Sequence, residues 1–132
     1  MTIRIGCCGF PKSQAEYYQR FSLVEVQQTF YQPPKVATVQ RWRAQAPLGF
    51  RFAIKAWQLI THEASAPTYR QPNLLLDGPK ENYGLFQPTP QVMDAWERTK
   101  ETALALGASV VLFQSPPSFA PTEQNITNLV TF

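Results

Sequence analysis

Histidine and cysteine are scarce in this chain, which limits the metal chemistry that it can support. Its 132 residues include one histidine and two cysteines, and the cysteines, Cys7 and Cys8, are adjacent. A structural zinc site needs about four such ligands, and no second cysteine pair or histidine cluster accompanies these two. A disulfide between neighbouring residues is strained and rare, so we predict reduced thiols and a cytoplasmic protein.

The sequence also lacks long apolar runs and runs of basic residues. Arg4, Gly6 and Gly9 interrupt the first ten residues, so we predict neither a signal peptide nor a membrane-spanning segment. The net charge is only +3, and the lysines and arginines are scattered. Nucleic acid is therefore an allowed partner but not a favoured one, because proteins dedicated to nucleic acid usually cluster these residues.

What the chain does contain is enough apolar surface for one packed domain. Hydrophobic residues make up 44% of it and aromatic residues 13%, so large side chains supply much of the core. Four segments read as strands, at residues 3–7, 22–28, 50–56 and 109–114. Helical patterns follow them, at about 15–21, 35–46, 90–106 and from 122 to the end. Residues 59–88 form a long irregular stretch, which is typical of a functional or mobile loop.

Alternation of strands and helices predicts an α/β fold with a parallel sheet and helical crossovers. An open doubly wound sheet and part of a barrel both agree with this order. The glycine-rich motif of dinucleotide-binding folds does not follow the first strand, so that fold has no positive support. We predict one domain, residues 1–132.

Several short motifs occur in order along nearly the whole chain. They are Gly6-x-x-Gly9-Phe10, Val24-Glu25-Val26-x-x-Thr29-Phe30-Tyr31-x-x-Pro34, Arg41-Trp42, Gly49-Phe50-x-Phe52-x-x-Lys55, Ile60-Thr61-His62 and Phe113-Gln114-x-Pro116-Pro117-Ser118-Phe119. Together they resemble the YecE-like family, a domain of unknown function numbered seventy-two. The resemblance implies a TIM-type (β/α)8 barrel of unestablished activity, of which this chain matches the N-terminal half.

Two departures from the family pattern matter. Gln28 stands where family members usually carry asparagine. Family members also run to about twice this length, since a full barrel takes roughly 200 residues or more. A half barrel would expose two strand edges and its inner face, and bare edges invite pairing. We therefore expect a homodimer, a missing C-terminal half, or poor solubility.

Candidate site residues follow from the barrel, because its functional groups gather where the strands end. Glu25, Lys55 and His62 are the candidate catalytic residues. Glu25 is a candidate general base, and Lys55 a binder of anions or, if desolvation lowers its pKa, a nucleophile. The alternative for these two is a structural ion pair with each other. His62 could shuttle protons near neutral pH, or it could only anchor a loop.

Thr29, Tyr31 and Gln114 are the candidate substrate-binding residues. Gln114 could orient a substrate through its amide, or it could satisfy backbone groups of the barrel. One histidine and one glutamate do not make a metal site, so no metal is predicted, and the cofactor stays unknown.

Three functions remain open at this point. The first is an enzyme acting on a small polar or anionic molecule by acid–base chemistry. The second is nucleic-acid binding or processing, and the third is an inactive fragment that needs a second half. The barrel fold alone does not choose among them.

Overall fold

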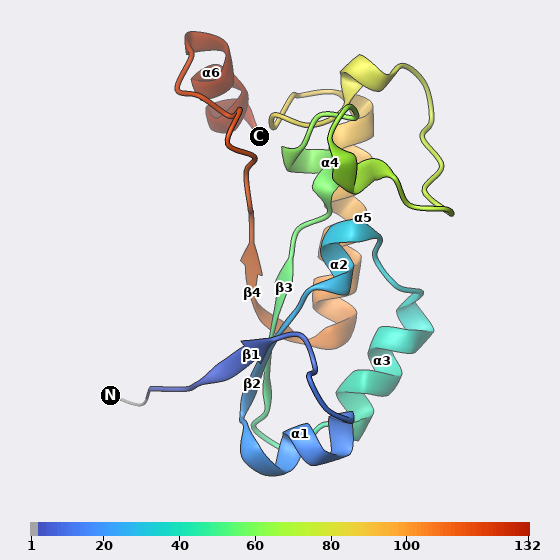
Figure 1. The fold of residues 1–132 in the computed structure, drawn as a ribbon, viewed down its shortest axis with the longest axis vertical. Helices are drawn as coiled ribbons and strands as arrows, with labels where there is room; N and C mark the ends of the chain where they lie inside the picture. Colours follow the sequence, from blue (N-terminus) through green and yellow to red (C-terminus); the bar gives the residue numbers. More distant parts are fainter. Residues whose placement is uncertain (1–2) are drawn as a thin grey trace.

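The centre of the molecule is a four-stranded sheet whose strands lie in sequence order and all run parallel (Figure 1). The computed structural model describes residues 3–132. The strands are β1 (Gly6–Cys8), β2 (Leu23–Val26), β3 (Arg51–Lys55) and β4 (Ala108–Leu112). This arrangement confirms the α/β prediction and is that of half a TIM-type barrel.

A helix follows each strand. These are α1 (Gln14–Arg20), α3 (Val36–Gln45), α5 (Pro90–Leu106) and α6 (Glu123–Thr131). The Thr89 hydroxyl caps α5 by accepting from the Val92 amide, and Gly107 ends it in the left-handed conformation. Figure 1 shows α3 and α5 side by side, with α6 beyond the end of β4.

Four short elements lie where no helix was predicted. Two one-turn helices, α2 (Gln28–Tyr31) and α4 (Gln58–Thr61), begin within three residues of the ends of β2 and β3. Two 3-10 turns, η1 (Pro67–Tyr69) and η2 (Lys80–Asn82), interrupt the long connection to α5. The prediction of a strand to residue 28 is therefore wrong at its end, because a single helical turn is too short to show a helical period.

The first predicted strand is also shorter than expected. Gly6 pairs with Leu23, which is the first residue of β2, so residues 3–5 have no partner on that strand. Ile3 and Ile5 are 78% and 72% exposed as a result. The apolar alternation at residues 3–5 is real, but a strand needs a neighbour to hydrogen-bond with.

Helices α1, α3 and α5 cover one face of the sheet. Val24, Phe52 and Ile54 point to that face and pack with Tyr17 and Leu106 in the main core. A second apolar cluster lies around α4 and α5 and includes Ile60, Tyr83, Phe86, Val92 and Ala95.

Residues that alternate with the core positions point to the opposite face. Val110 and Leu112 of β4 are 54% and 41% exposed there. Glu25 and Lys55 project to this same face, which corresponds to the inside of a barrel.

Candidate functional site

Three predicted site residues meet where β2, β3 and β4 end. The Lys55 ammonium donates to Gln114 Oε1 at 2.7 Å and lies 4.0 Å from Glu25 Oε1. Gln27 Nε2 donates to the same glutamate oxygen at 2.5 Å. The side chains of Lys55 and Glu25 are 16% and 24% exposed, so water still reaches both.

The predicted Glu25–Lys55 ion pair is present but loose. Its 4.0 Å separation is long for a hydrogen-bonded pair, and each partner makes a shorter contact with an uncharged amide. An ammonium carries three donors and Gln114 accepts from one of them. Lys55 therefore keeps a positive charge and donor capacity that a ligand can use.

Thr29 and Tyr31, in α2, have different surroundings. The Thr29 hydroxyl is buried within hydrogen-bond distance of the carbonyl oxygens of Val26 (3.0 Å) and Lys55 (2.7 Å). It ties together the ends of β2 and β3 and so helps to hold the base of the Lys55 side chain. Tyr31 is 42% exposed, and its backbone carbonyl accepts from Trp57 Nε1 at 3.1 Å.

Phe30 connects the charged pair to His62. The Lys55 ammonium lies 5.8 Å from the centre of the Phe30 ring, within the range of a cation–π contact. The His62 ring meets the same phenyl group edge to face, with 5.1 Å between ring centres. Lys55 and His62 are therefore neighbours of one aromatic ring, although no contact joins them directly.

His62 is 8% exposed, and its Nδ1 lies 2.8 Å from the Thr61 hydroxyl. Burial lowers the pKa of this imidazole from its ordinary value of 6.5. The ring is therefore neutral at neutral pH, where it can accept a proton but carries no charge.

This lowered pKa predicts a pH dependence of stability. As pH falls below about 6.5, the unfolded chain binds a proton at His62 more readily than the folded chain. The neutral, buried His62 therefore favours the folded state fully above about pH 6.5. This contribution to the free energy of unfolding is lost as the pH falls through the lower pKa that His62 has in the folded protein. We expect the His62→Gln variant to show a flatter dependence of unfolding free energy on pH in the range from about 6.5 down through the lowered folded pKa. Urea unfolding across that range measures it, and parallel slopes in both proteins would contradict it.

His62 also lines an open hollow of about 540 Å³ between the loop after β3 and the connection after β4. Thr68, Pro116, Pro117 and Ser118 are among its other walls. Pro116, Pro117 and Ser118 follow Gln114 closely in the chain, and Gln114 accepts a hydrogen bond from Lys55. The same segment therefore contributes to the hollow and to the Lys55 cluster.

Two buried oxygen atoms near this hollow have no hydrogen-bond partner among residues 3–132. They are Thr68 Oγ1 and Gln58 Oε1. The two residues are neighbours, because Gln58 Nε2 donates to the Thr68 carbonyl at 3.1 Å. Buried polar atoms are nearly always paired, so these two are exceptions in a region that solvent does not reach. Sequence reasoning missed both residues, since neither stands in a motif or at a strand end.

The family model described as "Protein of unknown function DUF72" matches residues 9–132. The chain belongs to the DUF72 family. A DUF72 family protein from Enterococcus faecalis V583, solved at 2.52 Å resolution, has a similar fold, with a TM-score of 0.60 and 22% sequence identity. The match covers 97% of this chain and 45% of that one, so this chain spans less than half the length of its structural neighbour. No curated protein matches.

Membership of the DUF72 family confirms the resemblance that the motifs indicated, and the structural neighbour supports the half-barrel fold. The family description contains no activity, so the chemistry of the site depends on its geometry. Within residues 3–132, no three His, Cys, Asp or Glu side chains gather closely enough to hold a metal ion. No helix in this described part is long and apolar enough to cross a membrane.

One loop of this DUF72 chain holds the backbone of His62 in place. Gly84 donates its amide to the Leu59 carbonyl at 2.9 Å, and Leu85 donates to Thr61 at 3.2 Å. Leu85 and Phe86 have φ values of 54° and 53°, a left-handed conformation that costs a residue with a side chain about 1–2 kcal/mol. Burial of Phe86 and the hydrogen bonds to α4 hold this strained turn beside the site.

Proposed function

We propose that this chain carries a site that binds a small anionic or polar molecule and acts on it by acid–base chemistry. The observation that carries the proposal is the state of Lys55. Its ammonium is held at 2.7 Å by the uncharged Gln114 amide and stands 4.0 Å from the nearest carboxylate oxygen. An uncharged amide holds this ammonium in place, and no carboxylate of residues 3–132 lies at hydrogen-bonding distance from it. Such an ammonium can form a charge-assisted hydrogen bond with an anionic ligand.

Glu25 and His62 supply the proton-transfer groups in this proposal. The Glu25 carboxylate is next to the bound anion's expected position and can accept a proton from it. His62, neutral because burial lowers its pKa, contacts the same Phe30 ring and can accept a proton from a ligand that extends into the hollow that it lines. General acid–base catalysis needs such groups within hydrogen-bond reach of the substrate, directly or through one water.

The hollow beside His62 supports the same function. Its volume of about 540 Å³ lies in the range typical of sites for small molecules, roughly 300–1,000 Å³. Its position beside His62 leaves room for the part of a ligand that extends beyond the Lys55 ammonium.

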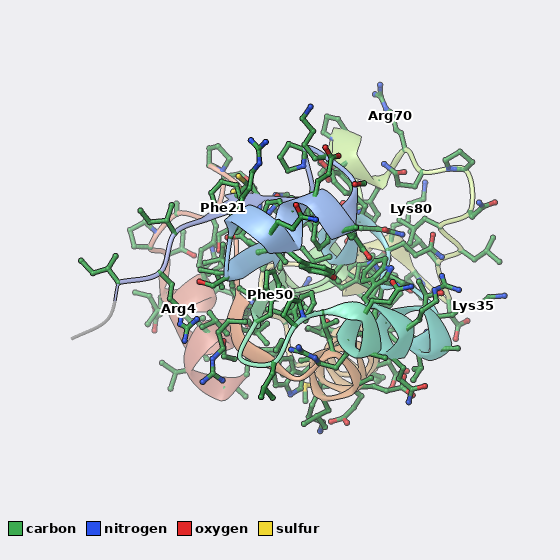
Figure 2. All side chains as sticks on the ribbon, turned by 90° about the horizontal axis from the view of Figure 1, so that it is seen from below. Arg4, Phe21, Lys35, Phe50, Arg70 and Lys80 are labelled. Carbon is green, nitrogen blue, oxygen red and sulfur yellow. The ribbon has the colours of Figure 1, made fainter. Side chains whose placement is uncertain are left out.

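The nucleic-acid alternative stays a prediction. Figure 2 shows the labelled Arg4 on the opposite side of the molecule from Arg70, Lys80 and Lys35, so these four cations do not form one continuous patch. Sequence-independent binding to a phosphate backbone usually depends on a continuous basic stripe or patch. The small-molecule site therefore has the stronger structural support.

Inorganic phosphate is a suitable first probe of the anion site. We expect Lys55→Met to weaken phosphate binding about tenfold or more, because a hydrogen bond to a charged group contributes roughly 1.5–3 kcal/mol. The matched control is Lys100→Met, which removes an ammonium that pairs with Glu97 on the surface of α5. Titration followed by NMR amide shifts gives both affinities and shows where phosphate binds.

Glu25→Gln is expected to change the phosphate affinity in the opposite direction from Lys55→Met in the same titration. It removes a negative charge 4.0 Å from the ammonium, so phosphate should bind more tightly. Equal affinities in wild type and Lys55→Met, or equal losses in Lys55→Met and Lys100→Met, would overturn the proposed site.

A further inference from the structure

The polar side chains at the ends of β2, β3 and β4 form a cluster that carries no net charge. Its members are Glu25, Gln27, Lys55 and Gln114, and we call it the strand-end cluster. At neutral pH it holds one carboxylate, one ammonium group and two uncharged amides. An ion of either sign is therefore attracted by one group of the cluster and repelled by another. A ligand that carries both charges can place each of them beside its opposite.

Protein groups use only part of the hydrogen-bonding capacity of this cluster. The Lys55 ammonium has three donors, and one of them goes to Gln114 Oε1 at 2.7 Å. Glu25 Oε1 accepts from Gln27 Nε2 at 2.5 Å. Among residues 3–132, Gln114 Nε2, Gln27 Oε1 and Glu25 Oε2 have no hydrogen-bond partner. The side chains of Lys55 and Glu25 are 16% and 24% exposed, so a ligand can reach them from solvent.

The two charged groups fix which end of each glutamine amide stays free. An ammonium group only donates, so Gln114 must turn its oxygen toward Lys55, and its NH2 group is left over. A carboxylate only accepts, so Gln27 must turn its NH2 group toward Glu25, and its oxygen is left over. Each amide therefore extends the hydrogen-bonding character of the charged group that it contacts.

The free groups of the strand-end cluster thus fall into two neighbouring halves. Lys55 and Gln114 have free donors, whereas Glu25 and Gln27 have free acceptors. The distance of 4.0 Å between Lys55 Nζ and Glu25 Oε1 brings the two halves side by side. A ligand carboxylate, whose oxygens only accept, fits the donor half, and a protonated amine, which only donates, fits the acceptor half.

We infer that this cluster binds a 2-amino carboxylate, a zwitterion whose ammonium group stands on the carbon next to its carboxylate. The inference rests on the function proposed above and names the class of molecule that the site takes. Attachment to adjacent carbons keeps the two charges of the ligand close together, as the 4.0 Å spacing of their partners requires. Both contacts join opposite charges, and such hydrogen bonds are about twice as strong as those between neutral groups.

A phosphate dianion matches the cluster less well. Its charge would lie beside the Glu25 carboxylate, which repels it, and its oxygens would leave the free acceptors of Glu25 and Gln27 without a donor. Phosphate therefore probes the Lys55 ammonium alone, whereas a 2-amino carboxylate probes both halves of the cluster.

Three molecules of nearly the same size test the inference in the unchanged protein. L-Alanine carries an ammonium group at the position where L-lactate carries a hydroxyl and propionate carries only hydrogen. We expect L-alanine to bind about tenfold or more tightly than propionate, with L-lactate between them, because a hydrogen bond to a charged group is the strongest of the three possible contacts. NMR amide shifts at constant pH and ionic strength measure the affinities and show where each molecule binds. Equal affinities for L-alanine and propionate would contradict the inference.

Glu25→Gln should remove this preference for L-alanine. We expect L-alanine to bind about tenfold or more weakly to the variant, whereas propionate should bind as well as before or better, since the repelling carboxylate is gone. Glu97→Gln is the matched control, because it removes the carboxylate of another Glu–Lys pair, with Lys100 on α5. A preference that survives Glu25→Gln, or that Glu97→Gln removes to the same degree, also rules out the inference.

Lys55→Met separates this inference from the function on which it rests. It should weaken the binding of L-alanine, propionate and phosphate alike, because all three contact the ammonium group. If it weakens phosphate and propionate binding while L-alanine shows no advantage in the unchanged protein, the anion site stands and its assignment to 2-amino carboxylates is overturned. If it changes none of the three affinities, the proposed function itself is overturned.

Discussion

Gly84→Ala is expected to lower the free energy of unfolding by about 3 kcal/mol or more, the range of severe backbone and packing changes. Gly84 has a φ of +82°, and a Cβ there would lie 2.3 Å from the carbonyl oxygen of His62 and 2.6 Å from the amide nitrogen of Glu63. Both are backbone atoms, so neither can rotate away. The loop or the turn that carries His62 would have to move.

Gly49→Ala is the matched control for that change. Gly49 has nearly the same φ, +80°, but apart from its chain neighbours no atom of residues 3–132 lies within 4 Å of the place that a Cβ would occupy. Only the cost of the left-handed conformation applies, about 1–2 kcal/mol. Urea unfolding of the two variants separates the steric cost from the conformational one. Similar losses at the two positions would contradict the close approach of Gly84 to His62.

Tyr17→Phe is expected to destabilise the protein by about 1–3 kcal/mol, because it removes two hydrogen bonds between a buried hydroxyl and the backbone of paired strands. The Tyr17 hydroxyl accepts from the Cys7 amide at 2.6 Å and donates to the Leu23 carbonyl at 2.7 Å. It therefore links the starts of β1 and β2 from the helix side of the sheet. Burial raises the pKa of Tyr17, which keeps the donating proton in place.

The neighbouring tyrosine provides the control. The Tyr18 hydroxyl is buried, and within residues 3–132 it has no hydrogen-bond partner. Removing it in Tyr18→Phe should leave stability unchanged or raise it slightly, since an unpaired buried hydroxyl is costly. Denaturant unfolding of both variants measures the difference, and equal effects on stability would contradict the bridging role of Tyr17.

Helix α5 was predictable over its full length, residues 90–106, because its signals are local. The Thr89 cap, the Pro90 start and the Gly107 stop act within one turn of the helix ends. The one-turn helices α2 and α4 were not predictable for the opposite reason. They are held by contacts with other parts of the chain, such as the hydrogen bond from Gly84 to Leu59.

Part of the candidate site was predictable from local sequence patterns, and part of it was not. Alternation along β2 and β3 placed Glu25 and Lys55 on one face at one end of the sheet, and the parallel order brought them together. The pattern could not show that Gln114 would be the closer partner of Lys55, because that contact joins residues 59 positions apart. Nor could it show Phe30 between Lys55 and His62.

The amino-acid sequence alone thus determined the strand order, the family and the strand ends at which charged groups gather. These features depend on short-range periodicity, caps and motifs. Only the tertiary structure decided which groups are paired and which are buried. Those properties arise from contacts between distant residues, and the local pattern of side chains does not encode their distances.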